Sequence, residues 1–320
     1  MKSFLVTGGS GFIGGALIKR LASEDIKIAL VDPETPPPAV EVFLSEDSYV
    51  KGSILDAELI DCLVSECSVV IHLGAEVGLF RVLDNQLRGL DTNVLGTRAV
   101  LDSVALHRKK VIIASSSEVY GQPSLTPIAE ESPRTFGPTS VARWSYGESK
   151  AIGEFFAHAL SKELGLRFTI ARLFNTVGPG QTGAYGMVVP RMVGQALRGE
   201  PITVFGDGSQ TRCFCHVDDV SRALIDLAES PDAVGETVNV GSQVEISILE
   251  LAERIINVLG SSSKITFVPY DQAYGDGFAE TYRRVPDISK IESLIGWRPQ
   301  KTLDDIIVDV AEYLRVNPDA

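Results

Sequence analysis

The sequence predicts an α/β fold, with a doubly wound parallel sheet joined to a smaller α/β C-terminal part. Two observations predict it. Short, continuous apolar runs alternate with helical patterns through the first half of the chain, and a glycine-rich turn joins the first run to the first helix. Continuous apolar strands separated by helices are typical of a parallel sheet covered on both faces. Right-handed crossovers make such a sheet doubly wound.

The predicted elements follow one another in the order that this fold requires. In the first half we expect strands at residues 4–6, 26–31, 69–73, 111–114 and 168–171, and helices at 12–21, 84–106 and 146–164. In the second half we expect a helix at 187–198, a strand at 202–205, and a helix at 247–259 that a capping box at Ser247 and Glu250 opens. The expected domains are 1–175 and 176–320, and some late segments can pack back on the first domain.

Composition excludes several classes of protein. The formal net charge of −13 over 320 residues argues against a nucleic-acid-binding protein, which needs the opposite charge. No apolar run has the length of a membrane span, and the N-terminus lacks the pattern of a signal peptide, so we expect a cytoplasmic protein with no membrane partner. The cysteines lack C-x-x-C spacing, which favours buried apolar side chains over a metal or redox site: Cys62, Cys67, Cys213 and Cys215.

The glycine-rich turn predicts a dinucleotide site. Glycines stand at positions 8, 11 and 14, between a predicted strand and a predicted helix. Gly8 permits the tight turn, Gly11 lets the backbone approach a pyrophosphate, and Gly14 lets helix and strand pack closely. The helix start, at Phe12 and Ile13, supplies amide donors and a positive dipole to the phosphates.

Acidic residues after the next strands specify the cofactor further. Asp32 ends the second strand, where a carboxylate binds the adenosine ribose hydroxyls and repels a 2′-phosphate, so NAD is favoured over NADP. We place Ile54 and Asp56 beside the adenine, where Asp56 accepts a hydrogen bond from the amine. An N-cap of the following helix explains Asp56 equally well.

A proton-transfer group is predicted at the carboxyl edge of the sheet, where such sheets bind ligands. Ser116 closes a strand there, and Tyr146 and Lys150 share one helix face because they are four residues apart. A neighbouring ammonium and a positive nicotinamide ring both lower the pKa of a phenol. Tyr146 then takes a proton from a hydroxyl while the carbon gives hydride to the cofactor, and Ser116 orients the oxygen. The alternative is a chain that binds NAD without turnover, as a redox sensor.

Together these residues resemble the extended short-chain dehydrogenase/reductases, the nucleotide-sugar epimerase/dehydratase group with a Rossmann-like NAD domain. The resemblance covers nearly the whole chain, including the segments 7–14, 72–75, 115–121, 146–150, 172–179, 206–212 and 284–287. It implies a nucleoside-diphosphate sugar, usually UDP-linked, bound by the C-terminal domain, and a homodimer formed by segments 84–106 and 146–164. It adds Leu73, Ala75 and Asn93 to the cofactor site. It implies these substrate-binding residues: Ser117, Asn175, Val189, Arg191, Arg212 and Arg284.

The resemblance leaves the outcome of the reaction open. Oxidation at sugar C4 gives a 4-keto sugar that is reduced to an epimer, loses carbon dioxide if it is a uronate, or eliminates water. Related dehydratases carry an Asp at the position of Ser117, and serine is a poor general acid, so dehydration is disfavoured. Glu118 with Arg284, and the segment 274–278, resemble UDP-glucuronate decarboxylases, in which the Glu and Arg act around C5. The segment 186–191 resembles epimerases, in which an arginine at the position of Arg191 holds the sugar carboxylate. We favour a 4-epimerase of UDP-glucuronate or UDP-glucose, with the decarboxylase as the alternative.

Overall fold

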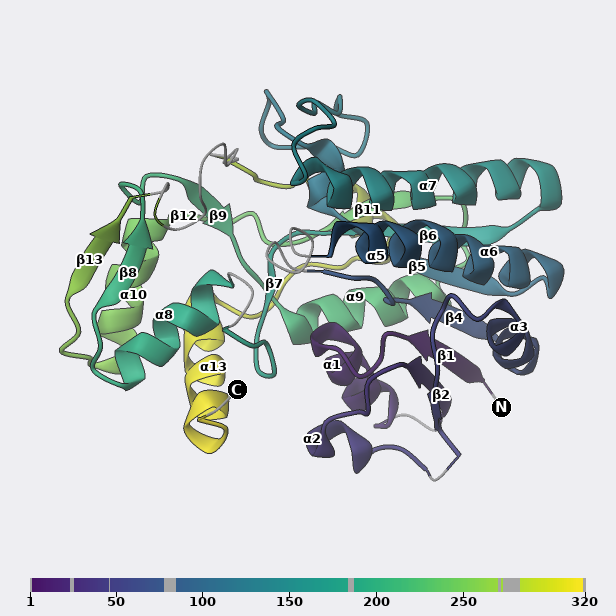
Figure 1. Cartoon of the computed structure of the whole chain (residues 1–320), viewed down its shortest axis with the longest axis horizontal. Helices are drawn as coiled ribbons and strands as arrows, with labels where there is room; N and C mark the ends of the chain where they lie inside the picture. The colour runs from purple at the N-terminus through teal and green to yellow at the C-terminus, as the bar shows by residue number, and fades with distance from the viewer. Residues whose placement is uncertain are drawn as a thin grey trace.

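A seven-stranded parallel sheet forms the centre of the chain (Figure 1). The computed structural model describes residues 2–23, 26–45, 47–77, 85–183, 187–269, 272 and 283–318. The strand order β11-β6-β5-β4-β1-β2-β3 is the doubly wound order, extended by one strand. Its strands are β1 (Ser3–Thr7), β2 (Lys27–Asp32), β3 (Tyr49–Lys51), β4 (Val69–His72), β5 (Lys110–Ser116), β6 (Arg167–Leu173) and β11 (Thr237–Val240).

Helices cover both faces of this sheet, because the strands inside the edge strand β3 carry buried apolar side chains on both faces. One core joins Phe4 and Val6 of β1 to α1 (Phe12–Leu21), α9 (Val217–Glu229) and α12 (Ser289–Ile295). The other joins Leu5 of β1 to α3 (Ala57–Glu66), α6 (Thr97–Leu106) and α7 (Trp144–Leu164). The fold is therefore the α/β, Rossmann-like fold predicted from the sequence.

The second half of the chain is divided between this sheet and a separate small layer. Strand β11 pairs with β6, and helices α9 and α12 pack on the sheet, although all three follow residue 175. The separate layer lies at the left of Figure 1 and has its own core. Its elements are α8 (Val188–Leu197), β8 (Ile202–Phe205), β9 (Thr211–Cys213), β12 (Glu245–Ser247), α10 (Ile248–Leu259), β13 (Ile265–Val268) and α13 (Leu303–Val316).

Short elements complete the chain and carry several site residues. The helix expected over 84–106 consists of α5 (Gln86–Leu90), the π-helical turn η1 (Asp91–Gly96) and α6, while position 84 itself lies outside the described residues. The others are α2 (Pro38–Glu41), the 3-10 turn η2 (Ser117–Tyr120), β7 (Thr176–Val177) and β10 (Cys215–His216). The capping box at Ser247 is present, and α10 ends at Gly260 in the left-handed conformation.

Two expectations about composition can be compared with the described residues. Cys67, Cys213 and Cys215 are buried and Cys62 is exposed, and all four are free thiols. Within the described ranges, none of the helices combines the length and the apolar character needed to cross a bilayer.

Candidate active site

The glycine loop has the shape that a dinucleotide needs. Gly8 has a φ of 73°, a left-handed value that favours glycine. A Cβ on Gly14 would lie 2.4 Å from the Cα of Gly9, so only glycine permits this close approach of α1 to the loop. Gly11 is exposed and forms the N-cap of α1, and no side chain caps this helix start. The loop can therefore bind the phosphates of NAD with backbone amides at Phe12, Ile13 and their neighbours.

Asp32 is oriented by the backbone around it. Its two carboxylate oxygens accept hydrogen bonds from Ser10 N at 3.1 Å and Glu34 N at 2.9 Å. Burial raises its pKa, and the two backbone hydrogen bonds oppose that rise. Each oxygen keeps a lone pair, so the carboxylate at the end of β2 fits the ribose hydroxyls of NAD.

Asp56 has the structural role that we considered as the alternative to adenine binding. Its Oδ1 accepts from Leu59 N at 3.0 Å and caps α3. Ile54 is buried beside Gly96, where a Cβ would lie 2.6 Å from its side chain. The N-cap interpretation is confirmed, and adenine contacts by Ile54 and Asp56 stay predictions.

Asn93 joins the loop after β4 to helix α7. It lies buried on the π-helical turn, where its Oδ1 accepts from Glu76 N at 2.8 Å. Its Nδ2 donates to Glu76 O and to Ser149 Oγ, each at 3.2 Å. π-helical turns are frequent at functional sites. Asn93 therefore fixes the loop that carries Leu73 and Ala75 against the helix that carries the tyrosine and the lysine.

Tyr146 meets Ser116 at the end of β5 and shares the α7 face with Lys150. Tyr146 is hydrogen-bonded to Ser116, and Lys150 lies one turn further along α7 and is buried. Burial raises the pKa of Tyr146 to about 12, aided by the charge of Glu118 and opposed by the Ser116 hydrogen bond. Burial lowers the pKa of Lys150 to about 8, although Glu154 opposes that change.

We expected the pKa of Tyr146 to be lowered. For the protein without bound cofactor this expectation is wrong, because the pKa is raised. Removing the phenol from water disfavours its ionised form, and this outweighs any attraction from the ammonium. A bound nicotinamide ring contributes positive charge at this position.

Glu118 lies beside this group, between two arginines. Its Oε1 accepts from Arg284 Nη1 at 2.7 Å, and its Oε2 lies 3.7 Å from Arg143 Nη2. Arg284 Nη1 also donates to Ser117 Oγ at 3.4 Å. Burial alone raises the pKa of Glu118, but the arginines overcome this and lower it to about 2. Glu118 is therefore a carboxylate at neutral pH and does not act as a general acid in this arrangement.

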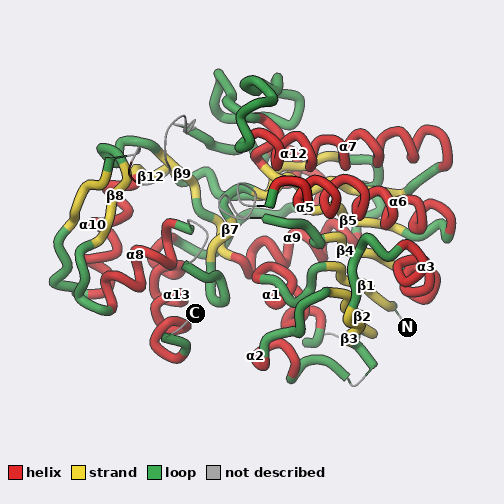
Figure 2. The backbone as a smooth tube through the Cα atoms, in the orientation of Figure 1, coloured by secondary structure: helices red, strands yellow, loops and turns green. Residues whose placement is uncertain are grey.

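A glycine allows the Glu118 turn and the Tyr146 helix to touch. A Cβ on Gly147 would lie 2.4 Å from Glu118 O, so α7 packs directly on η2 only because position 147 has no side chain. Figure 2 shows the loop 121–143, in green, leading into the start of α7. The acidic turn and the proton-transfer residues therefore form one site at the carboxyl edge of β5.

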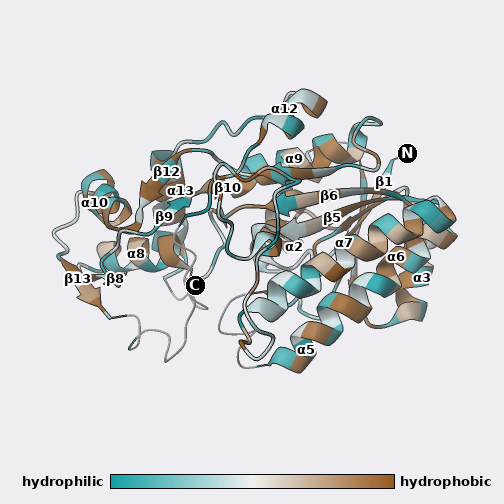
Figure 3. Cartoon of the chain, turned by 90° about the horizontal axis from the view of Figure 1, so that it is seen from above, coloured by the Kyte–Doolittle hydropathy of each residue, from teal (hydrophilic) through white to brown (hydrophobic). Residues whose placement is uncertain are grey.

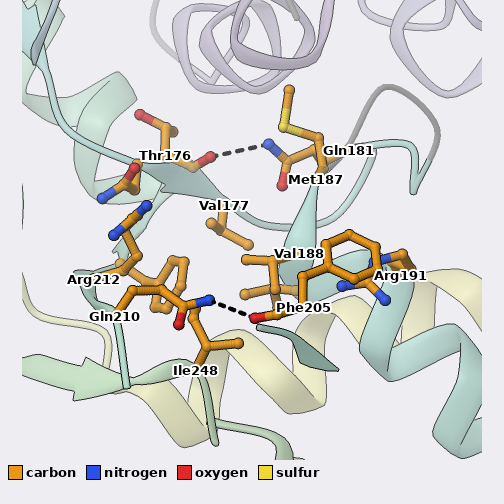
Figure 4. Close-up of a pocket in the computed structure, with 13 residues that line it drawn as sticks. Thr176, Val177, Gln181, Met187, Val188, Arg191, Phe205, Gln210, Arg212 and Ile248 are labelled. Atoms are coloured by element: carbon orange, nitrogen blue, oxygen red, sulfur yellow. Dashed lines mark hydrogen bonds between the residues drawn. The ribbon is translucent and has the colours of Figure 1, made fainter. Parts of the chain in front are cut away.

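A pocket of about 200 Å³ lies between β7 and the small layer (Figure 4). Arg212 from β9 and Arg191 from α8 lie at opposite ends of it. The charge of Arg212 also acts on Glu118, which connects the pocket to the Tyr146 group. It is lined by Asn175, Thr176, Val177, Gln181, Met187, Val188, Val189, Arg191, Phe205, Gln210, Arg212, Phe214 and Ile248.

Three of the predicted substrate-binding residues line this pocket in different ways. Asn175 has a φ of 27° and donates through Nδ2 to Cys213 O at 2.9 Å. Arg191 donates to Thr203 O at 2.9 Å. Val189 borders the pocket but is itself fully buried in the core of the small layer. The sequence interpretation missed the pocket-lining side chain of Phe205, for which the only signal was its position before a Gly-Asp-Gly turn.

Comparison with known proteins identifies the group to which these features belong. The model of the NAD dependent epimerase/dehydratase family matches residues 4–241. The chain belongs to this family. Its cofactor is NAD, which fits the glycine loop and Asp32 described above.

Family members of known activity resemble the chain over almost its whole length. The UDP-N-acetyl-alpha-D-glucosaminuronate decarboxylase of Bacillus cytotoxicus is 36% identical over 98% of both chains. The UDP-glucuronic acid decarboxylase 1 of Xenopus tropicalis is 32% identical over 98% of this chain and 72% of the relative. The crystal structure of UDP-glucuronic acid 4-epimerase from Bacillus cereus, in complex with UDP-glucuronic acid and NAD, is 27% identical with a TM-score of 0.85, over 98% of this chain and 99% of the other.

A buried polar network that sequence reasoning missed supports the site of this epimerase/dehydratase family member. Arg172 binds both carboxylate oxygens of Glu154, and its Nη1 donates to Tyr120 Oη at 2.9 Å. Tyr120 Oη donates to Asn239 Oδ1 at 2.7 Å, and Asn239 Nδ2 donates to Asp287 O at 3.1 Å. The network therefore connects α7 to the segment that carries Arg284. Residues 274–278, which resemble decarboxylases, lie outside the described residues.

Proposed function

We propose that this enzyme is a decarboxylase of UDP-linked uronic acids that uses NAD in a closed cycle. The substrate is UDP-glucuronate or its 2-acetamido analogue, and the product is the corresponding UDP-pentose sugar with carbon dioxide. NAD, held by the glycine loop at Gly8, Gly11 and Gly14 and by Asp32, would supply the hydride acceptor and donor for sugar C4. The side chains of the site move the proton of the C4 hydroxyl and stabilise the developing charge, and water is the source of the proton at C5.

The first half-reaction turns the uronate into a β-keto acid. Tyr146 accepts the proton of the C4 hydroxyl, and Ser116 orients that oxygen by a hydrogen bond. Lys150, one helical turn away, supplies positive charge that opposes the effect of burial on the phenol, and a bound nicotinamide ring would add to that charge. The C5–C6 bond then breaks, carbon dioxide leaves, and the electron pair moves into the C4 ketone as an enolate.

The second half-reaction needs a proton at C5 and a return of hydride to C4. Glu118 is ionised, so we assign it the orienting of a water molecule that gives its proton to C5, and the hydroxide left behind is neutralised by the solvent. Arg284 holds Glu118 in place and stabilises the enolate charge. After C5 is protonated, hydride returns to C4 and Tyr146 gives its proton back to the C4 oxygen.

The contact between Glu118 and Arg284 carries this proposal. The two residues are 166 positions apart, yet the fold joins them at 2.7 Å beside Tyr146. They are the pair that resembles the decarboxylases in the sequence. The identity of 36% to a UDP-N-acetylglucosaminuronate decarboxylase and 32% to a UDP-glucuronate decarboxylase supports the same reaction.

A product assay tests the proposal. The enzyme is incubated with NAD and either UDP-glucuronate or UDP-N-acetylglucosaminuronate, and products are identified by mass spectrometry. We expect release of carbon dioxide from at least one of them. The Glu118→Gln variant should still oxidise C4, seen as absorbance of reduced cofactor, but should release product slowly. A product with the mass of the substrate would overturn the decarboxylase assignment.

That last outcome would favour a 4-epimerase, the second candidate. The similarity in fold to UDP-glucuronic acid 4-epimerase supports it, as does the presence of Arg191 on the pocket. An epimerase must keep the carboxylate while the keto sugar turns over. Conversion of UDP-glucuronate to UDP-galacturonate without gas release is the result that would support it.

We also propose that two copies of the chain form a homodimer through the outer faces of α5, η1 and α7. These faces expose large apolar side chains: Leu87 is 79%, Leu95 57% and Phe155 64% exposed. Figure 3 shows brown segments on α5, α6 and α7 among the polar ones. Light scattering should give twice the chain mass, and Phe155→Glu should give the single-chain mass.

A further inference from the structure

Glu154 continues the helix face that carries Tyr146 and Lys150. The three residues follow one another at intervals of four along α7, so each lies about one turn from the next. Lys150 and Glu154 are both buried, with relative exposures of 7% and 6%. A carboxylate therefore lies in the interior, one turn beyond the ammonium whose charge the proposed reaction uses.

Three donors on neighbouring strands fix this carboxylate. Ser115 of β5 donates its hydroxyl proton to Oε1 of Glu154. Arg172 of β6 donates from Nε to Oε1 at 3.0 Å and from Nη2 to Oε2 at 2.6 Å. A carboxylate that is bound through both oxygens has one orientation. The position of this negative charge relative to Lys150 is therefore set by the fold.

Arg172 does not cancel the effect of Glu154 on the lysine. Its Nη1 donates to Tyr120 Oη at 2.9 Å and to Glu130 O at 2.7 Å, so part of the guanidinium serves η2 and the loop after it. Glu154 lies on the same helix as Lys150. Burial lowers the pKa of Lys150 to about 8, and the charge of Glu154 opposes this change.

His72 of β4 also lies close enough to sense the charge of Lys150. It is fully buried, and burial, aided by that charge, lowers its pKa to about 3. His72 is therefore neutral near pH 7, and the Tyr146 phenol, with its raised pKa, is neutral as well. Within the described part of the chain, the negative charge that acts on Lys150 comes from Glu154.

We propose that Glu154 is a positioning residue that keeps the Lys150 ammonium charged beside Tyr146, an inference that rests on the C4 oxidation proposed above and not on the fate of the keto sugar. An amine that is removed from water favours its neutral form. A neutral Lys150 has no charge to oppose the effect of burial on the phenol. The fixed carboxylate of Glu154 shifts the balance back toward the ammonium.

A purely structural role for Glu154 predicts the opposite change in Lys150. If the ion pair with Arg172 only holds α7 on β6, its loss loosens the packing and lets water reach the amine. Hydration favours the ammonium, so the pKa of Lys150 would rise toward 10.5. If Glu154 acts through its charge, removing that charge lowers the pKa further. The sign of the change therefore separates the two roles.

An NMR titration of the cofactor-free enzyme, labelled at lysine Cε with an NMR-active isotope, measures this change. The signal of Lys150 is the one that is missing from Lys150→Met. We expect Glu154→Gln to lower its midpoint by about one pH unit, a tenfold change in proton affinity and the low end for a nearby opposite charge. Glu154→Asp should keep most of the wild-type midpoint. Glu148→Gln is the matched control and should leave the midpoint unchanged, because Glu148 lies on the same helix but is half-exposed and bound to Arg134.

A second variant is needed because Glu154→Gln leaves Arg172 buried without its partner, which destabilises the fold. The double variant Glu154→Gln, Arg172→Met removes both charges. It should still lower the Lys150 midpoint, by less than the single variant does. An unchanged or raised midpoint in the double variant would overturn the proposal, because any fall in the single variant would then come from the stranded guanidinium.

The pH profile of cofactor reduction connects the titration to the reaction. The NAD-bound enzyme is mixed with UDP-glucuronate, and reduced cofactor is followed by its absorbance. In Glu154→Gln the alkaline limb of the profile should move to lower pH by about one unit, because Lys150 loses its proton earlier. A midpoint that falls while the profile stays the same would refute the role in the reaction. Absence of cofactor reduction in the wild type would affect the proposed function alone, since the NMR titration uses no sugar.

Discussion

The buried charge of Lys150 should lower the free energy of unfolding of this protein. Its side chain is buried on α7, and burial lowers its pKa from 10.5 to about 8. One pKa unit corresponds to about 1.4 kcal/mol, so keeping the ammonium charged in the folded state costs about 3 kcal/mol. Lys150→Met, which keeps the length of the chain and removes the charge, should raise the free energy of unfolding by up to about that amount at pH 7.

The destabilisation by Lys150 should decrease as the pH rises. Below about pH 8 the amine is protonated in both states, and the wild type bears the full cost. Between pH 8 and pH 10.5 the unfolded chain keeps the proton and the folded chain loses it, so this group makes the wild type more stable as pH rises. By pH 9.5 the wild type should recover about 2 kcal/mol relative to Lys150→Met.

Urea denaturation of both proteins without cofactor, at pH 7 and pH 9.5, measures this difference. Differences between the two proteins cancel the titration of groups that do not interact with Lys150. Lys162→Met, on the exposed side of the same helix, is the matched control and should show no such change. A stability difference for Lys150→Met that is the same at both pH values would refute the reasoning.

The remaining predictions concern the site and its support. Tyr146→Phe should abolish turnover and retain ligand binding by calorimetry, because only the proton-carrying oxygen is lost; turnover near the wild-type rate would contradict its role. Arg284→Met should lower the free energy of unfolding by about 3 kcal/mol, because it leaves Glu118 without its hydrogen-bonded partner, and adding Glu118→Gln should restore part of this in urea denaturation. Asn239→Leu should lower the free energy of unfolding by about 2 kcal/mol in the same assay, because the Tyr120 hydroxyl loses its acceptor and Asp287 O loses its donor, while Ile128 O keeps its bond from Asp287 N; an unchanged midpoint would refute the bridging role. Gly147→Ala should slow turnover about tenfold, since the new Cβ would lie 2.4 Å from Glu118 O and displace α7.

Much of the sheet and the cofactor site could be predicted because their signals are local. Strands such as β4 and β5 are continuous apolar runs, and burial on both faces produces that pattern directly. Gly8, Gly14 and Asp32 act within their own βαβ unit, so their spacing in the sequence is also their spacing in space. The position of β11 could not be predicted in this way, because its partner β6 lies more than sixty residues earlier in the chain.

The catalytic pair could be recognised, but its ionisation could not. Four residues on a helix place Tyr146 and Lys150 on one face whatever surrounds them. Their pKa values depend on burial, which is a property of the packed molecule, and burial reverses the direction expected for the tyrosine. The sequence likewise contains Glu154 and Arg172 without any sign that they pair with each other in the interior.

The sequence by itself determined that this chain is an α/β enzyme of a known family with an NAD site and a tyrosine–lysine pair. Each of these depends on short segments whose geometry is nearly independent of the rest. Only the tertiary structure decided that Arg284 and Arg143 meet at Glu118, because these residues come from three separate segments. The proposed choice of reaction depends on that meeting, since electrostatic interactions depend on distances in space and not on order in the chain.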